Sequence, residues 1–188
     1  MQYYEHIVKN RHSCRSFSKK EVGDDLLYKL LTYYEEVDGK LTAHINTSIK
    51  FYDGSVWEKL NDHVGYNGYC IKAPKYMVLY SDEKGRYLEN AGFIAEGLTL
   101  RMTELGLAAC WQTVNDAEGV KEALGKETDM VVACVVAFGY KDRKNKEKPV
   151  DKISLDDLTY GQKYGQDIDP SLFYRELEDG LRAVAHSQ

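Results

Sequence analysis

The hydrophobic residues of this chain follow two spacings, one helical and one typical of buried strands. Residues 86–105 carry an apolar side chain at every third or fourth position, which predicts the longest helix of the chain. Residues 24–37 repeat this helical spacing over a shorter stretch. Two uninterrupted apolar runs, 76–80 and 130–138, predict buried strands. Because helices and strands interleave, the pattern predicts an α+β domain of two or three layers.

Shorter patterns predict the remaining elements. We expect a strand at 47–52, short helices at 55–64 and 120–124, and an amphipathic helix at 171–185. Phe17-Ser18 is expected to lie in the N-cap region of the helix that follows it.

Two glycines interrupt the longest predicted helix. Gly92 and Gly97 each weaken a helix by about 1 kcal/mol relative to alanine. Small residues kept at that cost suggest the close approach of another backbone. We therefore expect this helix to be buried on more than one side, for example against a second copy of the chain.

Length, charge and cysteine content limit the class of protein. A chain of 188 residues fits one domain, here residues 1–188. Its net charge of −5, without a basic arm, argues against nucleic acid as a partner. No segment predicts a signal peptide or a membrane span, and the four cysteines form no C-x-x-C pair. We therefore expect a cytoplasmic protein with reduced thiols and no membrane partner.

The strongest candidate for binding chemistry lies near the start of the chain. Arg11-His12-Ser13-Cys14-Arg15 combines two guanidinium groups, an imidazole and a hydroxyl, a set suited to holding a phosphate. The alternative is a basic surface turn. The sequence contains no nucleophile motif, no P-loop, no Gly-x-Gly-x-x-Gly and no metal-ligand spacing among its five histidines. This combination favours an enzyme whose cofactor carries the chemistry, with no metal.

Four segments, in this order, resemble the nitroreductase family of flavin-dependent oxidoreductases. They are Arg11 to Phe17 followed by Glu21-Val22, Ala73-Pro74 before the strand 76–80, Asn90-Ala91-Gly92 in a helix that leads to Leu105–Trp111, and Val135–Tyr140. The resemblance covers roughly residues 4–148. It implies a nitroreductase-like α+β fold, with a central, mainly antiparallel sheet flanked by helices, in an intertwined homodimer. It also implies that residues 150–188 form an extension that packs on the partner subunit.

The resemblance implies FMN as the cofactor and assigns its phosphate end to the first motif. Arg11 and Ser13 correspond to contacts with the phosphate and ribityl chain, and His12 to a further contact at the phosphate. Arg15 corresponds to a position near the pyrimidine edge of the ring, where its charge would stabilise the anionic reduced flavin. A basic residue of a later loop would complete the phosphate site; the four candidates are Arg143, Lys144, Lys146 and Lys148.

The ring end of the cofactor is assigned to two other segments. The backbone of Gln112, Thr113 and Val114 is implied to approach the flavin N5, with a backbone N–H as the donor. Asn67 is a candidate contact for the flavin edge, with a turn residue as the alternative.

The activity that the resemblance implies is a ping-pong reaction. NADH or NADPH reduces the flavin, and a small-molecule acceptor such as a nitroaromatic or a quinone is reduced next. The chain departs from the family where Gln112–Asn115 replace the glycines that many relatives carry. A flavin-binding or degenerate protein on the same scaffold, with a regulatory or carrier role and no turnover, is therefore the alternative.

Overall fold

The computed structural model describes residues 6–8, 10–144, 160 and 163–166. The chain divides into two compact units, residues 1–12 with 146–188 and residues 13–145. In the first unit, residues 6–8 and 10 are helical, and the Arg11 N–H donates to the Ile7 carbonyl (2.9 Å). The predicted helix at 171–185 lies outside the described residues.

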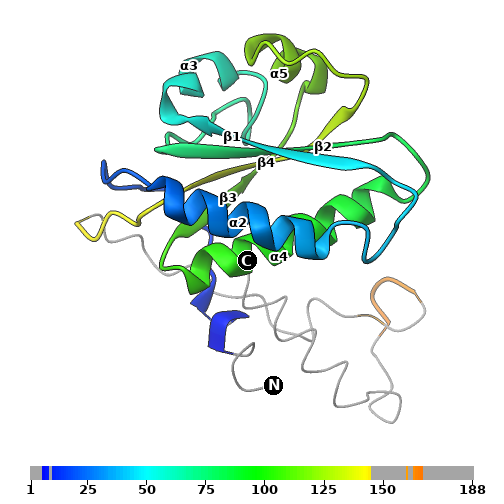
Figure 1. Cartoon of the computed structure of the whole chain (residues 1–188), viewed down its shortest axis with the longest axis horizontal. Coiled ribbons are helices and arrows are strands. Elements are labelled where there is room, and N and C mark those ends of the chain that lie inside the picture. Colours follow the sequence, from blue (N-terminus) through cyan, green and yellow to red (C-terminus); the bar gives the residue numbers. More distant parts are fainter. Residues whose placement is uncertain (1–5, 9, 145–159, 161–162, 167–188) are drawn as a thin grey trace. The chain divides into compact units, whose positions relative to one another are not determined.

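The second unit is built on a four-stranded antiparallel sheet (Figure 1). The strands are β1 (Thr47–Asp53), β2 (Lys75–Ser81), β3 (Ala108–Gln112) and β4 (Val131–Gly139), in the spatial order β1-β2-β4-β3. The predicted strands at 47–52, 76–80 and 130–138 are confirmed to within a residue or two. β3 was not predicted, because its residues were expected to form the loop after the long helix.

Helices cover both faces of this sheet (Figure 1). The helices α2 (Asp24–Val37) and α4 (Tyr87–Glu104) pack on one face, where Leu30, Leu98 and Phe138 are fully buried. The other face is covered by the short helices α3 (Trp57–Leu60) and α5 (Ala117–Ala123), with the 3₁₀ turn η1 (Gly54–Val56) beside α3. The two central strands are therefore apolar on both faces, which explains their uninterrupted hydrophobic runs. The α+β class and the antiparallel sheet are confirmed.

Some details of the helices differ from the sequence pattern. Helix α2 begins after Gly23, so the expected cap at Phe17-Ser18 is wrong: the Ser18 hydroxyl accepts the Lys20 N–H (3.3 Å) in a local turn instead. Two leucines of the predicted stripes are exposed, Leu31 (40%) and Leu88 (58%).

The two glycines of α4 have different surroundings. A Cβ at Gly97 would lie 3.2 Å from the hydroxyl of Tyr33 on α2, so a side chain rather than a backbone approaches there. A Cβ at Gly92 would meet no described atom within 4 Å. The burial of α4 against a second copy of the chain stays a prediction.

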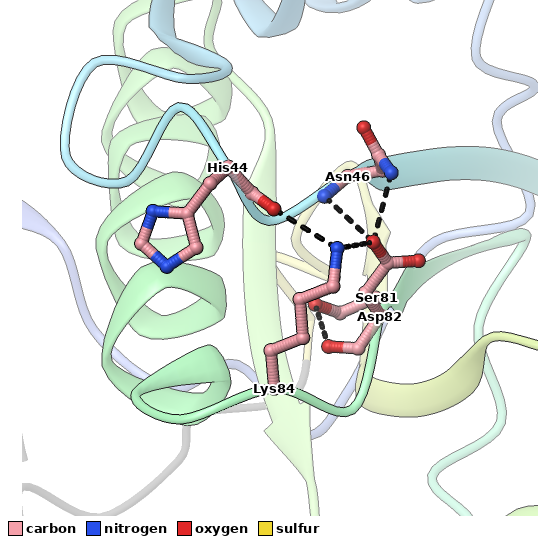
Figure 2. Close-up of polar contacts among 5 residues, drawn as sticks. All are labelled: His44, Asn46, Ser81, Asp82 and Lys84. Atoms are coloured by element: carbon pink, nitrogen blue, oxygen red, sulfur yellow. Dashed lines mark hydrogen bonds and ion pairs between the residues drawn. The ribbon is translucent and has the colours of Figure 1, made fainter.

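A polar cluster joins the start of β1 to the end of β2. One oxygen of Asp82 accepts the Asn46 side-chain amide (2.8 Å), the Asn46 N–H (3.2 Å) and the Lys84 ammonium (2.7 Å) (Figure 2). The Lys84 ammonium also donates to the His44 carbonyl (3.0 Å). The bond from Lys84, followed by that from the Asn46 N–H, lowers the pKa of Asp82 below its ordinary value of 3.8.

The lowered pKa of Asp82 predicts a contribution to stability that depends on pH. Because the folded state binds this proton more weakly than the unfolded state, the stabilisation is complete above about pH 3.8 and is lost as the pH falls through the lower, folded pKa. We expect Asp82→Asn to lower the free energy of unfolding at pH 7, and the gap to the wild type to shrink below pH 3.8. Denaturant unfolding at several pH values measures this, with Glu83→Gln at the exposed neighbouring position as the control. A gap that is equal at pH 7 and pH 3 would contradict it.

Candidate functional site

The segment 13–18 lies along one end of the sheet, where β3 begins and β4 ends. Ser13 forms a parallel bridge with Ala109, the second residue of β3. Just beyond β4, the Asp142 N–H donates to the Ser16 carbonyl (3.0 Å). Residues 13–18, which include most of the predicted phosphate motif, are therefore held by backbone bonds to two segments that are far away in the sequence.

This arrangement brings predicted basic residues to the same end of the sheet. Arg15 lies in the bonded segment, and Arg143 and Lys144 directly follow Asp142. All three basic side chains are exposed. The Lys144 N–H donates to the Asp142 carboxylate (2.9 Å), which fixes the turn that carries these residues. The backbone of the late loop therefore lies beside the segment 13–18. That one of its basic residues contacts a phosphate stays a prediction, and Lys146 and Lys148 lie outside the described residues.

Arg11 and His12 belong to the other compact unit and directly precede Ser13 in the chain. Arg11 is buried and His12 is exposed. Their contact with a phosphate stays a prediction.

A second group of predicted residues meets at the opposite end of β3. The Gly65 N–H donates to the Thr113 carbonyl (2.7 Å), and Val64 lies opposite Val114 in an antiparallel bridge. The Asn115 side-chain amide donates to the Gly65 carbonyl (2.8 Å). The loop that contains Asn67 is thereby attached to the segment 112–115.

Asn67 occupies the tip of a tight turn. Its φ is 52° and that of Gly68 is 80°, two consecutive left-handed residues that Asn and Gly tolerate best. Two backbone bonds close the turn, from Gly68 N–H to Gly65 O (3.2 Å) and from Tyr69 N–H to Tyr66 O (3.1 Å). The Asn67 side chain is exposed, so both of the interpretations of this residue, turn former and ligand contact, fit its position.

Gln112 has a role inside the protein. Its side-chain oxygen accepts the Ile71 N–H (3.0 Å), and its nitrogen donates to the carbonyls of Cys110 (3.3 Å) and Trp111 (3.1 Å). The buried side chain therefore braces the loop 61–73 against β3. A cofactor contact of Gln112 remains a prediction for its backbone alone.

The hydrogen bonds on either side of Val114 define the direction of its backbone N–H and carbonyl groups. The bonds that flank the bridge run from Gly65 N–H to Thr113 O and from Asn115 N–H to His63 O (2.9 Å). Val64 and Val114 thus form a non-hydrogen-bonded pair, in which the N–H and carbonyl of Val114 point away from Val64. Val114 therefore presents a backbone donor on the side facing away from the loop.

The two groups are separated by the length of β3. Ser13 lies opposite Ala109, and Val114 follows Ala109 by five positions, roughly 16 Å at the rise of a strand. One end of this stretch carries basic side chains, and the other carries an amide and a directed backbone N–H. The spacing suits an elongated ligand with an anionic end and a polar, flat end.

Two of the four cysteines are unsuited to act as nucleophiles. All four are buried, and burial raises the pKa of Cys70 to about 11 and that of Cys134 to about 12. These two side chains are therefore neutral thiols at neutral pH. Within the described ranges, no group of three or more His, Cys, Asp or Glu side chains is placed to hold a metal ion, and no helix has the length and hydropathy needed to span a membrane.

One polar pair near Val114 was not predicted from the sequence. The Nδ1 atom of His63 lies 3.0 Å from an oxygen of Asp116, which also caps α5 by accepting the Gly119 N–H (2.9 Å). Fifty-three positions separate the pair in sequence, so no local spacing signals it. Only the Asp-x-x-Gly start of a short helix was visible.

The sequence matches the model of the family described as "Putative TM nitroreductase" over residues 3–169, so the chain belongs to this nitroreductase family. No curated protein matches it.

Several solved structures share its fold. An FMN-dependent nitroreductase from Clostridium difficile R20291 is 22% identical, with a TM-score of 0.63 over 76% of this chain and 90% of that one. The FMN-dependent nitroreductase NfnB from Mycobacterium smegmatis, in complex with NADPH, is 17% identical, with a TM-score of 0.66 over 86% and 99%. A "putative nitroreductase in complex with FMN" from Desulfovibrio desulfuricans is 16% identical, with a TM-score of 0.64 over 79% and 91%.

Proposed function

We propose that this protein is an FMN-dependent oxidoreductase that uses NADH or NADPH to reduce small acceptors such as nitroaromatics and quinones. The observation that carries the proposal is the pair of polar groups at the two ends of β3, in a chain of the nitroreductase family. The names of the similar structures add support, since two are described as FMN-dependent and one is described in complex with NADPH.

The basic end of β3 fits a phosphate monoester. Arg143 and Lys144 are exposed on a turn bonded to the segment 13–18, and Ser13 adds a hydroxyl. Arg15, which the resemblance places near the pyrimidine edge of the ring, is exposed on this same segment, and we assign it to the phosphate end instead. Arg11 and His12 immediately precede this segment in the chain. Guanidinium groups form short, charge-assisted bonds to phosphate oxygens, stronger than neutral hydrogen bonds. We assign the phosphate and ribityl chain of FMN to this end.

The other end fits the polar edge of the isoalloxazine ring. The Val114 N–H, directed away from Val64, is our candidate donor to N5, with Thr113 beside it. Asn67 lies on the rigid turn attached to this segment and can both donate and accept along the ring edge. The residues present therefore fit FMN at both ends.

When bound, FMN supplies the hydride chemistry that no side-chain motif of this chain provides. The protein would hold the ring at a fixed distance from its phosphate anchor and place a backbone donor and the Asn67 amide beside it. A ping-pong order, a homodimer with α4 at its seam and a cytoplasmic location complete the proposal. The extension expected at 150–188 lies almost entirely outside the described residues, and its packing on the partner subunit stays a prediction.

A second candidate is a flavin-binding protein without turnover. It is favoured by the segment 112–115, which lacks the glycines that many relatives carry, and by Gln112, whose buried side chain is bonded to the backbone of Ile71 and Cys110. The scaffold would then bind FMN and give no hydride acceptor access to it.

Anaerobic spectroscopy separates the two candidates. The protein is saturated with FMN and mixed with NADPH or NADH, and the flavin absorbance is followed before a quinone is added. We expect bleaching by the nicotinamide and recovery with the quinone. A bound flavin that neither nucleotide bleaches would support the second candidate, a flavin-binding protein without turnover. A protein that takes up no FMN would contradict both candidate functions.

A further inference from the structure

His63 and Asp116 form a fixed pair outside the residues assigned to FMN. One oxygen of Asp116 lies 3.0 Å from Nδ1 of His63, and the other accepts the Gly119 N–H at 2.9 Å. The bond from Gly119 and then the one from His63 lower the pKa of Asp116, so the carboxylate is ionised at neutral pH. An ionised carboxylate only accepts, and Nδ1 therefore carries a hydrogen while Nε2 is directed away from Asp116.

The backbone of α5 makes room for this imidazole. A Cβ at Gly119 would overlap Nδ1 of His63 and an oxygen of Asp116. Gly119 does not have the positive φ that requires glycine, and glycine inside a helix costs about 1 kcal/mol relative to alanine. The contact with His63 therefore explains why a glycine stands at this position.

The imidazole belongs to the segment that pairs with the proposed N5 contact. The His63 carbonyl accepts the N–H groups of Asn115 (2.9 Å) and Asp116 (3.1 Å), and the next residue, Val64, lies opposite Val114. The His63 side chain is 34% exposed, so water and a small molecule can reach it. An oriented imidazole with an accessible second nitrogen is a suitable proton donor and acceptor.

We propose that His63 is a catalytic acid that protonates the acceptor, and that Asp116 is the positioning residue that orients it; the inference rests on the proposed oxidoreductase function. A quinone that has received a hydride, with the nicotinamide oxidised in exchange, is a hydroquinone monoanion. Its second oxygen takes the proton from Nε2–H of the His63 imidazolium as the hydride arrives, so proton transfer belongs to the rate-setting step and gives the neutral hydroquinone and a neutral imidazole. Water returns the proton to the exposed ring.

The test compares two acceptors that differ in their need for a proton. The prereduced, FMN-loaded enzyme is mixed in a stopped-flow instrument with a soluble benzoquinone or with ferricyanide, which takes an electron and no proton. For His63→Gln we expect the rate with quinone to fall about a hundredfold, since a positioned acid contributes 10²- to 10⁴-fold. The rate with ferricyanide should stay within twofold of the wild type, and the FMN affinity, measured by quenching of flavin fluorescence, should be unchanged. Asp116→Asn, which keeps a good helix cap, should show a smaller loss with quinone alone.

Two further variants make the test decisive. His44→Gln changes an exposed histidine outside the site and should leave both rates unchanged. Gly119→Ala keeps the imidazole but displaces it, and should reproduce the selective loss with quinone if His63→Gln does not fold. An unchanged quinone rate in His63→Gln, or an equal loss of rate with both acceptors, would overturn the role of His63. The proposed function would still stand in that case if the wild-type protein shows the absorbance of bound FMN. A wild type that binds no FMN would instead refute the proposed function.

Discussion

Phe138→Ala should lower the free energy of unfolding by about 3–5 kcal/mol, the usual cost of truncating a fully buried phenylalanine. Phe138 lies on β4 with no exposed surface and meets Phe51 of β1 edge to face, with ring centroids 5.8 Å apart. It also stands opposite Ala109, which bridges to Ser13. The substitution therefore leaves a cavity between the sheet and α4 and loosens the strand that holds the first motif. Equilibrium denaturation measures the loss.

The control for this change is Tyr28→Ala. Tyr28 is an aromatic residue of α2 that is 70% exposed, so its truncation should change stability by no more than about 0.5 kcal/mol. A loss of less than about 1 kcal/mol in the free energy of unfolding of Phe138→Ala would contradict the described packing of Phe138 on this face of the sheet.

Arg11→Ala should weaken FMN binding by roughly ten- to a hundredfold. A charge-assisted hydrogen bond is worth about 1.5–3 kcal/mol, and each 1.4 kcal/mol is a factor of ten in affinity. Quenching of flavin fluorescence on titration with protein gives the dissociation constant. The loss should be largest at low ionic strength, because salt screens the attraction between arginine and phosphate.

Lys40→Ala is the matched control for Arg11→Ala. It removes the same charge from an exposed position after α2, outside the proposed site. We expect its FMN affinity to equal that of the wild type. If Arg11→Ala bound FMN as tightly as Lys40→Ala, Arg11 would be excluded from the phosphate site.

The sequence predicts most of the core of this fold because the buried elements are long and strongly patterned. Residues 24–37 and 130–138 were predicted nearly to their ends, since a helix or central strand buries many side chains in a regular order. β3 was not predicted, because Ala108–Gln112 is short and contains small residues. Its strand geometry depends on pairing with β4, which is remote in the sequence.

The candidate site was likewise predicted only where its signal is local in the sequence. The basic composition of residues 11–15 was visible in the sequence, but the backbone bond from Asp142 to Ser16 that brings Arg143 and Lys144 to the same end was not. The backbone of Gln112 stays a predicted ligand contact, but the bond from the Ile71 N–H to its side chain could not be predicted. Such partners are set by tertiary folding and have no local signal.

A parallel titration of the protein with FMN and with riboflavin tests the central claim most directly, because the two ligands differ only in the phosphate. Binding of FMN at least tenfold tighter than riboflavin, with a gap that narrows as salt is raised, is the result we expect from basic residues gathered at the start of β3. Equal affinity for both ligands, or uptake of neither, would contradict it.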